Sequence, residues 1–299
     1  MQGFYLTNLL PPGMPNKFSI TTNGILWDLE KMQHSNFNNV INEIENGACA
    51  NTYSMLTNIP SNQLRVSGLI EDSYFDKIMD NLLKACLAFS FINGTSVRPT
   101  SSTPFSKVSL IQPGDKFPRD HSIHSPKSCL NTLSYYIDFV ESFCNNNNVF
   151  STEKMLLIIH YYLDSIAAWS LENQYILLTT ILQIIGDTEK TSGRKFAQLH
   201  AKQRKSRIGF YDYLAGAADR AGIQKLTFDA VKLRNKLIHE GKFDNSTYPS
   251  KSNITDLISE SFSWIDSYIF KIIGVQHQPN PRYASKILEN FMNSFSHDL

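Results

Sequence analysis

The chain has 299 residues, of which 42% are hydrophobic and 18% are charged, a balance typical of a folded globular protein rather than a disordered one. Its formal net charge of +1 excludes a broadly cationic surface, so any contact with nucleic acid must be local. This length is enough for two modest domains, each with its own core.

The pattern of residues 1–125 predicts a small α+β domain. The sequence does not indicate a role for it. Short β-prone runs between Gly, Pro and Asn residues predict strands at 4–7, 17–21, 63–70 and 108–111. An apolar stripe at helical spacing predicts a helix over 72–91. Residues 91–97 are then expected to turn into a strand. The acidic and arginine residues of this half form no recognisable catalytic set.

A Pro- and Gly-bounded linker is expected from Pro113 to Pro126. Within it, His121 and His124 could ligate a metal with Asp120, but no further ligand cluster accompanies them, so solvated loop histidines are the favoured interpretation. We therefore expect neither a metal site nor any other cofactor.

The four cysteines, at positions 49, 86, 129 and 144, lack the paired spacing of a zinc site or a disulfide framework. Free and mostly buried thiols in a reducing compartment are the favoured interpretation. The chain also begins without a basic segment followed by an apolar run, the pattern of a secretory signal. Both observations lead us to expect a cytoplasmic protein.

From residue 127 onward the pattern predicts helices that form a compact up-and-down bundle. The expected helices cover 130–143, 155–169, 171–185, 196–203, 210–221, 226–239 and 254–273. We expect residues 151–154 to cap the second of them and Gly186 to end the third. The fold class is therefore mainly α, with a helical domain at 126–275 and a tail at 276–299 that carries Ile287, Leu288 and Phe291 as apolar anchors.

The most apolar stretch, residues 155–185, is not expected to cross a membrane. His160, Asp164, Glu172 and Gln183 interrupt it, and a membrane span tolerates such residues poorly. Two buried helices are the favoured interpretation.

The most informative motif is the run from Leu233 to Gly241, on the last turns of a predicted helix. Gly241 is expected to end the helix in the left-handed conformation. At about 100° per residue, Asn235 and His239 lie on one face about 40° wide, whereas Arg234 lies about 140° from His239 and could join that site only through its long side chain. A guanidinium that grips phosphate and an imidazole that moves protons near neutral pH suit chemistry on RNA phosphodiesters.

Spacing alone does not establish this site. Two other pairs, Arg119 with His124 and Arg194 with His200, have a similar separation. The first lies in a Pro- and Ser-flanked stretch typical of a loop, and the second lacks the adjacent amide and the Gly stop. The residues by themselves favour a surface ion pair for Arg234 and a favourable helix C-terminal cation for His239.

The run from Val231 to Lys242 resembles the RNxxxH form of the motif of HEPN domains, closest to the larger proteins of the Apea-like kind, over roughly residues 130–275. The resemblance implies a helical domain that acts as a metal-independent endoribonuclease, working as a homodimer in a toxin or anti-phage defence setting. It matches Arg234 and His239 to the signature residues and Asn235 to the polar residue after the arginine. Many relatives carry a glutamate in the second core helix, near the position where this chain has Gln183.

A basic stretch precedes the motif helix and contains no acidic residue. Its members are candidates for RNA-backbone binding, with a solvated helix face as the alternative: Arg194, Lys195, Lys202, Arg204, Lys205 and Arg207. Phe210, Tyr211 and Tyr213 beside it could stack an unpaired base or belong to the core.

The expected reaction is attack of a ribose 2′-OH on the adjacent phosphorus, with His239 as base or acid, Arg234 holding the phosphate and Asn235 orienting the imidazole or the substrate. The alternative is a noncatalytic HEPN module that binds RNA or a protein partner, and a third possibility is a structural dimerisation scaffold. An antitoxin or defence partner would fit the first two; no membrane is expected.

Overall fold

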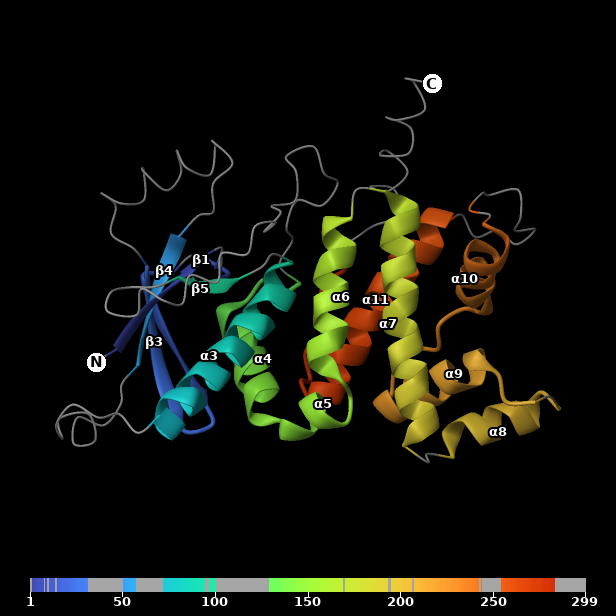
Figure 1. Ribbon diagram of the computed structural model, residues 1–299, viewed down its shortest axis with the longest axis horizontal. Coiled ribbons are helices and arrows are strands. Elements are labelled where there is room, and N and C mark those ends of the chain that lie inside the picture. Colours follow the sequence, from blue (N-terminus) through green and yellow to red (C-terminus); the bar gives the residue numbers. More distant parts are fainter. Residues whose placement is uncertain are drawn as a thin grey trace, which may run out of the picture. The chain divides into compact units, whose positions relative to one another are not determined.

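We describe the protein from a computed structural model (Figure 1). The structure describes residues 2–7, 9, 11–13, 15–31, 51–57, 72–94, 97–100, 129–168, 170–192, 195–205, 207–241, 243 and 254–282. The chain forms two compact units, one of residues 1–119 with 126–147 and the other of residues 120–125 with 148–299. The described part is mainly helical, as expected, with a sheet confined to the first unit.

The sheet of the first unit is antiparallel and has the strand order β2-β3-β4-β1-β5. Its strands are β1 (Gln2–Thr7), β2 (Lys17–Thr22), β3 (Ile25–Lys31), β4 (Asn51–Thr57) and β5 (Arg98–Thr100). Asn23 and Gly24 join β2 to β3 with φ angles of 48° and 79°, the two positive values that a tight hairpin turn requires. Along β2, exposed and buried side chains alternate, so one face of this hairpin belongs to the core.

Two helices, α3 (Asp72–Asn93) and α4 (Leu133–Asn145), complete the first unit. The ring of Phe89 on α3 stacks on Tyr136 of α4 with centroids 5.5 Å apart, and Phe91 stacks on Phe139 at 5.6 Å. The α4 helix also caps the hairpin, since the backbone N–H of Thr21 donates to Glu141 Oε1 over 2.6 Å. The division therefore falls after Asn147 and α4 belongs with the sheet, whereas the sequence placed it in the helical domain.

Three buried cysteines of this unit, Cys86, Cys129 and Cys144, are free thiols, as predicted. Burial raises the pKa of Cys86, and it raises that of Cys144 to about 12, so both stay protonated and act as small apolar side chains. Cys49 lies outside the described residues.

The second unit is a helical bundle built around α7. Its helices are α5 (Asn147–Ser151), α6 (Met155–Ala167), α7 (Leu171–Thr191), α8 (Phe196–Gln203), α9 (Phe210–Ala221), α10 (Phe228–Glu240) and α11 (Ile254–Ile273). The helix α7 contacts α6, α9, α10 and α11, and Figure 1 shows α6 and α7 lying side by side. At about 100° per residue, its buried residues, including Tyr175, Leu178, Ile181 and Ile185, cover about half of the helix circumference, and the other side is exposed.

Two predicted helix ends are wrong. Gly186 does not end α7, which continues to Thr191; instead, a Cβ there would lie 2.8 Å from Phe210 Cε2, so the glycine lets an aromatic ring approach the helix. Residues 151–154 provide no side-chain cap for α6, because Ser151 ends α5 and Lys154 occupies the N-cap position in the left-handed conformation with φ of 54°. The predicted stop at Gly241 is confirmed, with φ of 63°.

The strand expected over residues 91–97 is also wrong. Phe91 to Asn93 close α3, Gly94 ends it with φ of 70°, and the next strand begins at Arg98. The expected helix over 72–91 and the strands at 4–7 and 17–21 are confirmed. The strands expected at 63–70 and 108–111, the linker with His121 and His124, and the anchors Ile287, Leu288 and Phe291 lie outside the described residues.

A buried polar cluster ties the second unit together, and we call it the Arg220 cluster. Arg220 donates to Glu189 Oε2, to Glu153 Oε2 (both 3.1 Å) and to the hydroxyl of Tyr268 (2.7 Å), and Tyr268 donates to the same Glu153 oxygen over 2.9 Å. These side chains come from α7, α9, α11 and the residues before α6. The cluster therefore fixes the relative positions of the helices that carry the motif helix.

A second buried ion pair fastens the segment after α11 onto the bundle. Arg282 Nε lies 3.3 Å from Asp266 Oδ2 on α11, and the Arg282 guanidinium covers the ring of Tyr162 on α6 at 5.2 Å. Both charged side chains are almost fully buried. The beginning of the predicted tail, residues 276–282, is thus part of the helical unit.

We expect the change Arg282→Met to lower the free energy of unfolding in a pH-dependent way. Burial raises the pKa of Asp266 and the charge of Arg282 lowers it only in part, so loss of Arg282 raises that pKa further. A raised carboxyl pKa means that the folded protein holds the proton more tightly, so ionisation costs stability as the pH rises. The loss should reach about 3 kcal/mol at pH 8 and be smaller at pH 5, as measured by urea unfolding.

The matched control is Arg282→Met combined with Asp266→Asn, which removes the titrating group. Measured against Asp266→Asn alone, its unfolding free energy should fall by the same amount at both pH values. A loss in Arg282→Met that does not change with pH would contradict this account of the pair.

Across the described part of the chain, no helix combines the length and apolar character needed to traverse a lipid bilayer.

Candidate active site

The motif helix α10 is held at its beginning and along its buried side. Thr227, the residue before its first turn, donates from its backbone N–H and its hydroxyl to the two carboxylate oxygens of Glu260 on α11, each over 2.7 Å. The buried hydroxyl of Tyr175 on α7 donates to the carbonyl of Ala230 over 2.6 Å. Val231 and Leu233 are buried in the bundle. These contacts fix α10 against α7 and α11 and leave its opposite side in solvent.

Arg234 lies half-buried between α10, α7 and the start of α9. Its Nη1 donates to Asn235 Oδ1 over 2.9 Å and its Nη2 donates to Gln183 Oε1 over 3.1 Å, while the guanidinium covers the ring of Phe210 at 5.2 Å. Its Nε–H is buried without a hydrogen-bond partner among the described residues. The guanidinium is therefore oriented by two amide oxygens and an aromatic face.

Gln183 on α7 supports Arg234 through its side-chain amide. Its Oε1 accepts from Arg234, and its Nε2 donates to Asp187 Oδ1 over 3.0 Å, so an orienting chain of hydrogen bonds runs along α7. A glutamate at 183 would neutralise the guanidinium, whereas an amide leaves the positive charge uncompensated. The side chain of α7 that accepts from Arg234 is therefore neutral.

Within the parts of the chain that the structure describes, no carboxylate lies within ion-pairing distance of Arg234. Among the described residues, Arg234 therefore does not form the surface ion pair that the sequence left open as an alternative. A half-buried guanidinium without a counter-ion favours an anionic ligand, because its positive charge acts in surroundings that screen it less than water does.

Asn235 and His239 lie on the exposed side of α10, one turn apart. The Asn235 side chain is turned toward Arg234 by the hydrogen bond it accepts. No hydrogen bond or ion pair of His239 is found among the described residues, and its imidazole is open to solvent in the last turn of the helix. The geometry thus brings Arg234 and Asn235 into contact and places His239 one turn further along the face of Asn235, as the spacing predicted.

Only one residue of the two competing arginine–histidine pairs, His200, lies among the described residues. Arg119, His124 and Arg194 lie outside the described residues. His200 Nε2 lies 2.6 Å from Asp219 Oδ2, so its imidazole is held against α9.

The basic stretch divides into one structural arginine and several exposed cations. Arg204 binds the fully buried Asp212 with both arms, Nε to Oδ1 at 3.1 Å and Nη2 to Oδ2 at 2.5 Å. Asp212 also accepts from the backbone N–H of Gly209 at 2.7 Å, which closes the start of α9. The fork of Arg204 is thus occupied, whereas four other members are exposed: Lys195, Lys202, Lys205 and Arg207.

The aromatic residues beside this stretch have separate roles. Phe210 lies under the Arg234 guanidinium, and the space for its ring comes from Gly186. Tyr211 contacts the ring of Phe228 edge-on at 5.2 Å. Burial raises the pKa of Tyr211. Phe228, the first residue of α10, is 47% exposed, and the sequence analysis did not select it. Phe228 precedes Lys232 by four residues and Asn235 by seven, and this spacing predicts that the three residues share one face of the helix.

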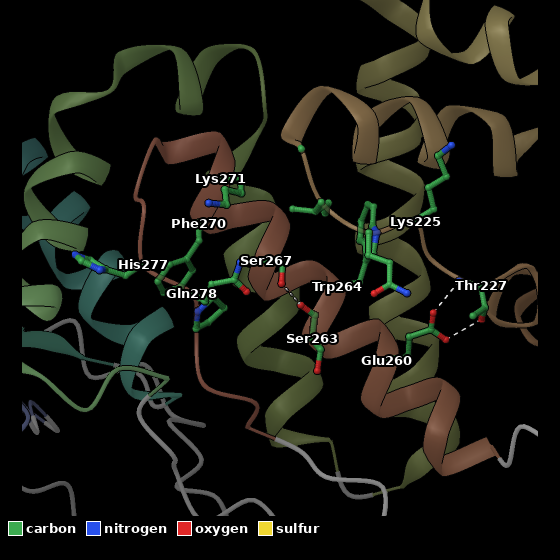
Figure 2. Close-up of a pocket in the computed structure, with 14 residues that line it drawn as sticks. Lys225, Thr227, Glu260, Ser263, Trp264, Ser267, Phe270, Lys271, His277 and Gln278 are labelled. Carbon is green, nitrogen blue, oxygen red and sulfur yellow. Dashed lines mark hydrogen bonds between the residues drawn. The ribbon is translucent and has the colours of Figure 1, made fainter.

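A groove of about 570 Å³ lies elsewhere in the second unit, between the α9–α10 connection, α11 and residues 277–279 (Figure 2). Figure 2 shows Glu260 hydrogen bonded to Thr227 at one side and Lys271 and His277 at the other. No member of the predicted catalytic or basic sets lines it, and it meets the motif helix only at Thr227. The groove is therefore distinct from the Arg234 site.

A search of the described residues found no group of three or more His, Cys, Asp or Glu side chains that could hold a metal ion. Comparisons of the chain with protein-family models, with curated proteins and with solved structures found no match.

Proposed function

We propose that the protein is a metal-independent endoribonuclease of the HEPN type, with its active site at Arg234, Asn235 and His239. The observation that carries the proposal is the guanidinium of Arg234, which is oriented by the amides of Gln183 and Asn235 and has no counter-ion among the described residues. Such a group suits a phosphodiester oxygen, and the exposed imidazole of His239 stands one helical turn beyond Asn235.

The proposed reaction is an internal transesterification of RNA. The ribose 2′-oxygen forms a bond to the adjacent phosphorus while the bond from phosphorus to the 5′-oxygen breaks. One base takes the proton of the 2′-OH and one acid gives a proton to the leaving 5′-oxygen, so the products are a 2′,3′-cyclic phosphate and a 5′-OH. Arg234 stabilises the charge on the non-bridging oxygens, and Asn235 holds the guanidinium or the substrate in place.

Two imidazoles serve this reaction better than one, because a single histidine cannot be base and acid in the same step. We therefore propose a two-fold homodimer in which His239 of each protomer enters a shared site, one as base and the other as acid. The exposed position of His239 in the last turn of α10 leaves it free to take part in such a site. RNA in a toxin or anti-phage defence setting is the proposed substrate, with an antitoxin as a possible partner.

Incubation of the purified chain with end-labelled RNA in EDTA tests the proposal. We expect cleavage that persists in EDTA and yields 2′,3′-cyclic phosphate and 5′-OH ends, which mass spectrometry identifies. Binding of RNA without cuts would instead support the noncatalytic HEPN module. Cleavage that EDTA abolishes, or products with 5′-phosphate ends, would contradict the proposed chemistry.

A further inference from the structure

The exposed side of α10 carries four residues of complementary chemistry in one stripe. At about 100° per residue, Phe228, Lys232, Asn235 and His239 fall within a sector about 60° wide. All four residues are exposed. At 1.5 Å per residue the stripe is about 16 Å long. An aromatic ring, a cation, an amide and an imidazole thus follow one another along one helix face that ends at the proposed active site.

The aromatic ring at the beginning of this stripe is held in place by its neighbours. Tyr211 supports Phe228 edge-on at 5.2 Å with an interplanar angle of 89°, and Arg204 covers Tyr211 at 5.7 Å. Arg204 is in turn fixed by the buried Asp212. The Phe228 ring is therefore backed by a packed assembly and still 47% exposed. A fixed exposed ring loses little freedom when a flat partner stacks on it.

Lys232 gives the stripe one exposed cation that can contact a phosphate. Lys232 Nζ lies 5.2 Å from the centroid of Phe228 and 3.2 Å from Asp229 Oδ1, and its side chain is half exposed. An exposed ion pair of this kind contributes little and can be exchanged for a phosphate. The four stripe residues include no carboxylate. The exposed cations Lys195, Lys202, Lys205 and Arg207 lie just before α8, on α8 and in its connection to α9.

We propose that this stripe binds single-stranded RNA and delivers it to the active site, with an unpaired base stacked on Phe228 and a phosphate on Lys232. The inference rests on the proposed function and names its substrate class as single-stranded rather than duplex RNA. A base inside a duplex has both faces covered by its neighbours and cannot stack on a side chain, whereas every unpaired base offers a face. Phe228 selects unpaired RNA, and Arg234 with His239 acts on the phosphodiester further along the stripe.

The test measures binding of an RNA that cannot react, so that binding and cleavage fail separately. A fluorescent 2′-O-methyl oligonucleotide of about twelve nucleotides lacks the attacking hydroxyl, and fluorescence anisotropy gives its Kd alone and in a duplex. The wild-type chain should bind the single strand more tightly than the duplex. Phe228→Ala should weaken the single-strand Kd roughly 5- to 150-fold, and Phe228→Trp should restore it.

Two controls keep the measurement specific. Ile176→Ala removes a side chain of similar exposure from α7, 40% against 47%, and should leave the Kd unchanged. Lys232→Gln should reduce the dependence of log Kd on log salt concentration by about 0.7, the value for one single-strand phosphate contact, whereas Lys190→Gln, at an exposed position near the end of α7, should not.

The inference is overturned if Phe228→Ala binds the single strand as tightly as the wild-type chain, or if duplex binding falls equally. It is also overturned if the main effect of Phe228→Ala is to dissociate a dimer in light scattering, because the face would then be an interface between copies. If the wild-type chain binds as described but cuts no RNA in EDTA, the proposed nuclease fails while the single-strand surface remains.

Discussion

Replacing His239 with alanine is expected to lower the rate of RNA cleavage roughly a hundred- to ten-thousand-fold, the usual contribution of a positioned acid or base. The side chain is exposed and has no hydrogen bond or ion pair among the described residues, so the variant should unfold within about 0.5 kcal/mol of the wild-type chain. Single-turnover cleavage of labelled RNA measures the rate, and urea unfolding checks the fold. His160→Ala, which removes another exposed imidazole from α6, is the matched control and should cleave normally.

The arginine should behave differently from a simple positive charge. Arg234 uses both arms of its guanidinium on two amide oxygens and lies on an aromatic ring, an arrangement that an ammonium group cannot reproduce. Arg234→Lys should therefore lose most of the cleavage that Arg234→Ala loses, roughly a hundredfold or more. Cleavage by Arg234→Lys at the wild-type rate would show that only charge is required at this position.

Mixing wild-type and His239→Ala chains tests whether the two imidazoles act together. If both protomers must supply His239, mixed dimers are inactive, and an equal mixture that exchanges freely keeps about a quarter of the wild-type activity. If each protomer cleaved by itself, about half would remain. A residual activity near half would reject the shared site while leaving His239 itself catalytic.

The local chemistry of the sequence was sufficient for some parts of the fold. The stripe of apolar residues in α3 and the glycine after α10 each have one dominant physical cause, so the predicted helix and its stop are confirmed. The hairpin of β2 and β3 was missed although Asn23-Gly24 between two apolar runs is its usual signal. The sequence therefore contains the local signal for this hairpin at Asn23 and Gly24.

Other parts depend on contacts between distant residues and could not be derived from local pattern. A glycine at position 186 is typical of a helix end, yet Gly186 lies inside α7. A Cβ atom at this position would collide with the ring of Phe210. The ring of Phe210 supports the guanidinium of Arg234. Gly186, which the sequence predicted as a helix end, therefore helps to position the candidate catalytic arginine. Only the packing of α9 on α7 reveals this role.

In the candidate site, too, some features follow from local sequence and others depend on contacts between distant residues. The spacing within α10 placed Asn235 and His239 on one face, because both belong to a single helix. All six residues of the basic stretch were candidates for RNA binding, with a solvated helix face as the alternative, but Arg204 binds the carboxylate of Asp212, eight residues later in α9. Charge counted along a sequence cannot distinguish a free cation from one whose partner arrives through folding.

The largest stability effect is expected at the Arg220 cluster, where Arg220→Met should lower the free energy of unfolding by about 3–5 kcal/mol. Arg220 is the cation between Glu153 and Glu189, whose side chains are 7% and 0% exposed. Methionine keeps most of the volume but leaves the two buried carboxylates without the positive charge they contact. Urea unfolding followed by circular dichroism measures the loss through the midpoint and slope.

This loss should not depend on the ionisation of the arginine. Burial works against the charge of Arg220, but Tyr268, Glu153 and Glu189 outweigh it and raise the pKa of the guanidinium. A raised pKa in a cation means that its contribution is fully present below the pKa of the unfolded chain and is lost only as the pH rises through the folded value. The arginine therefore stays charged throughout the neutral range, and its stabilisation persists there.

A nearby exposed cation provides the control for this prediction. Lys225, in the connection after α9, lies 3.5 Å from Asp219 with both side chains about 40% exposed, so Lys225→Met should cost less than about 1 kcal/mol. Replacing Glu189 together with Arg220 by apolar residues should recover part of the loss, because it removes a stranded charge along with its partner. If Arg220→Met unfolds at the same urea concentration as Lys225→Met, the cluster does not hold the helices of this unit together, and the stability of the scaffold behind Arg234 must come from its apolar core.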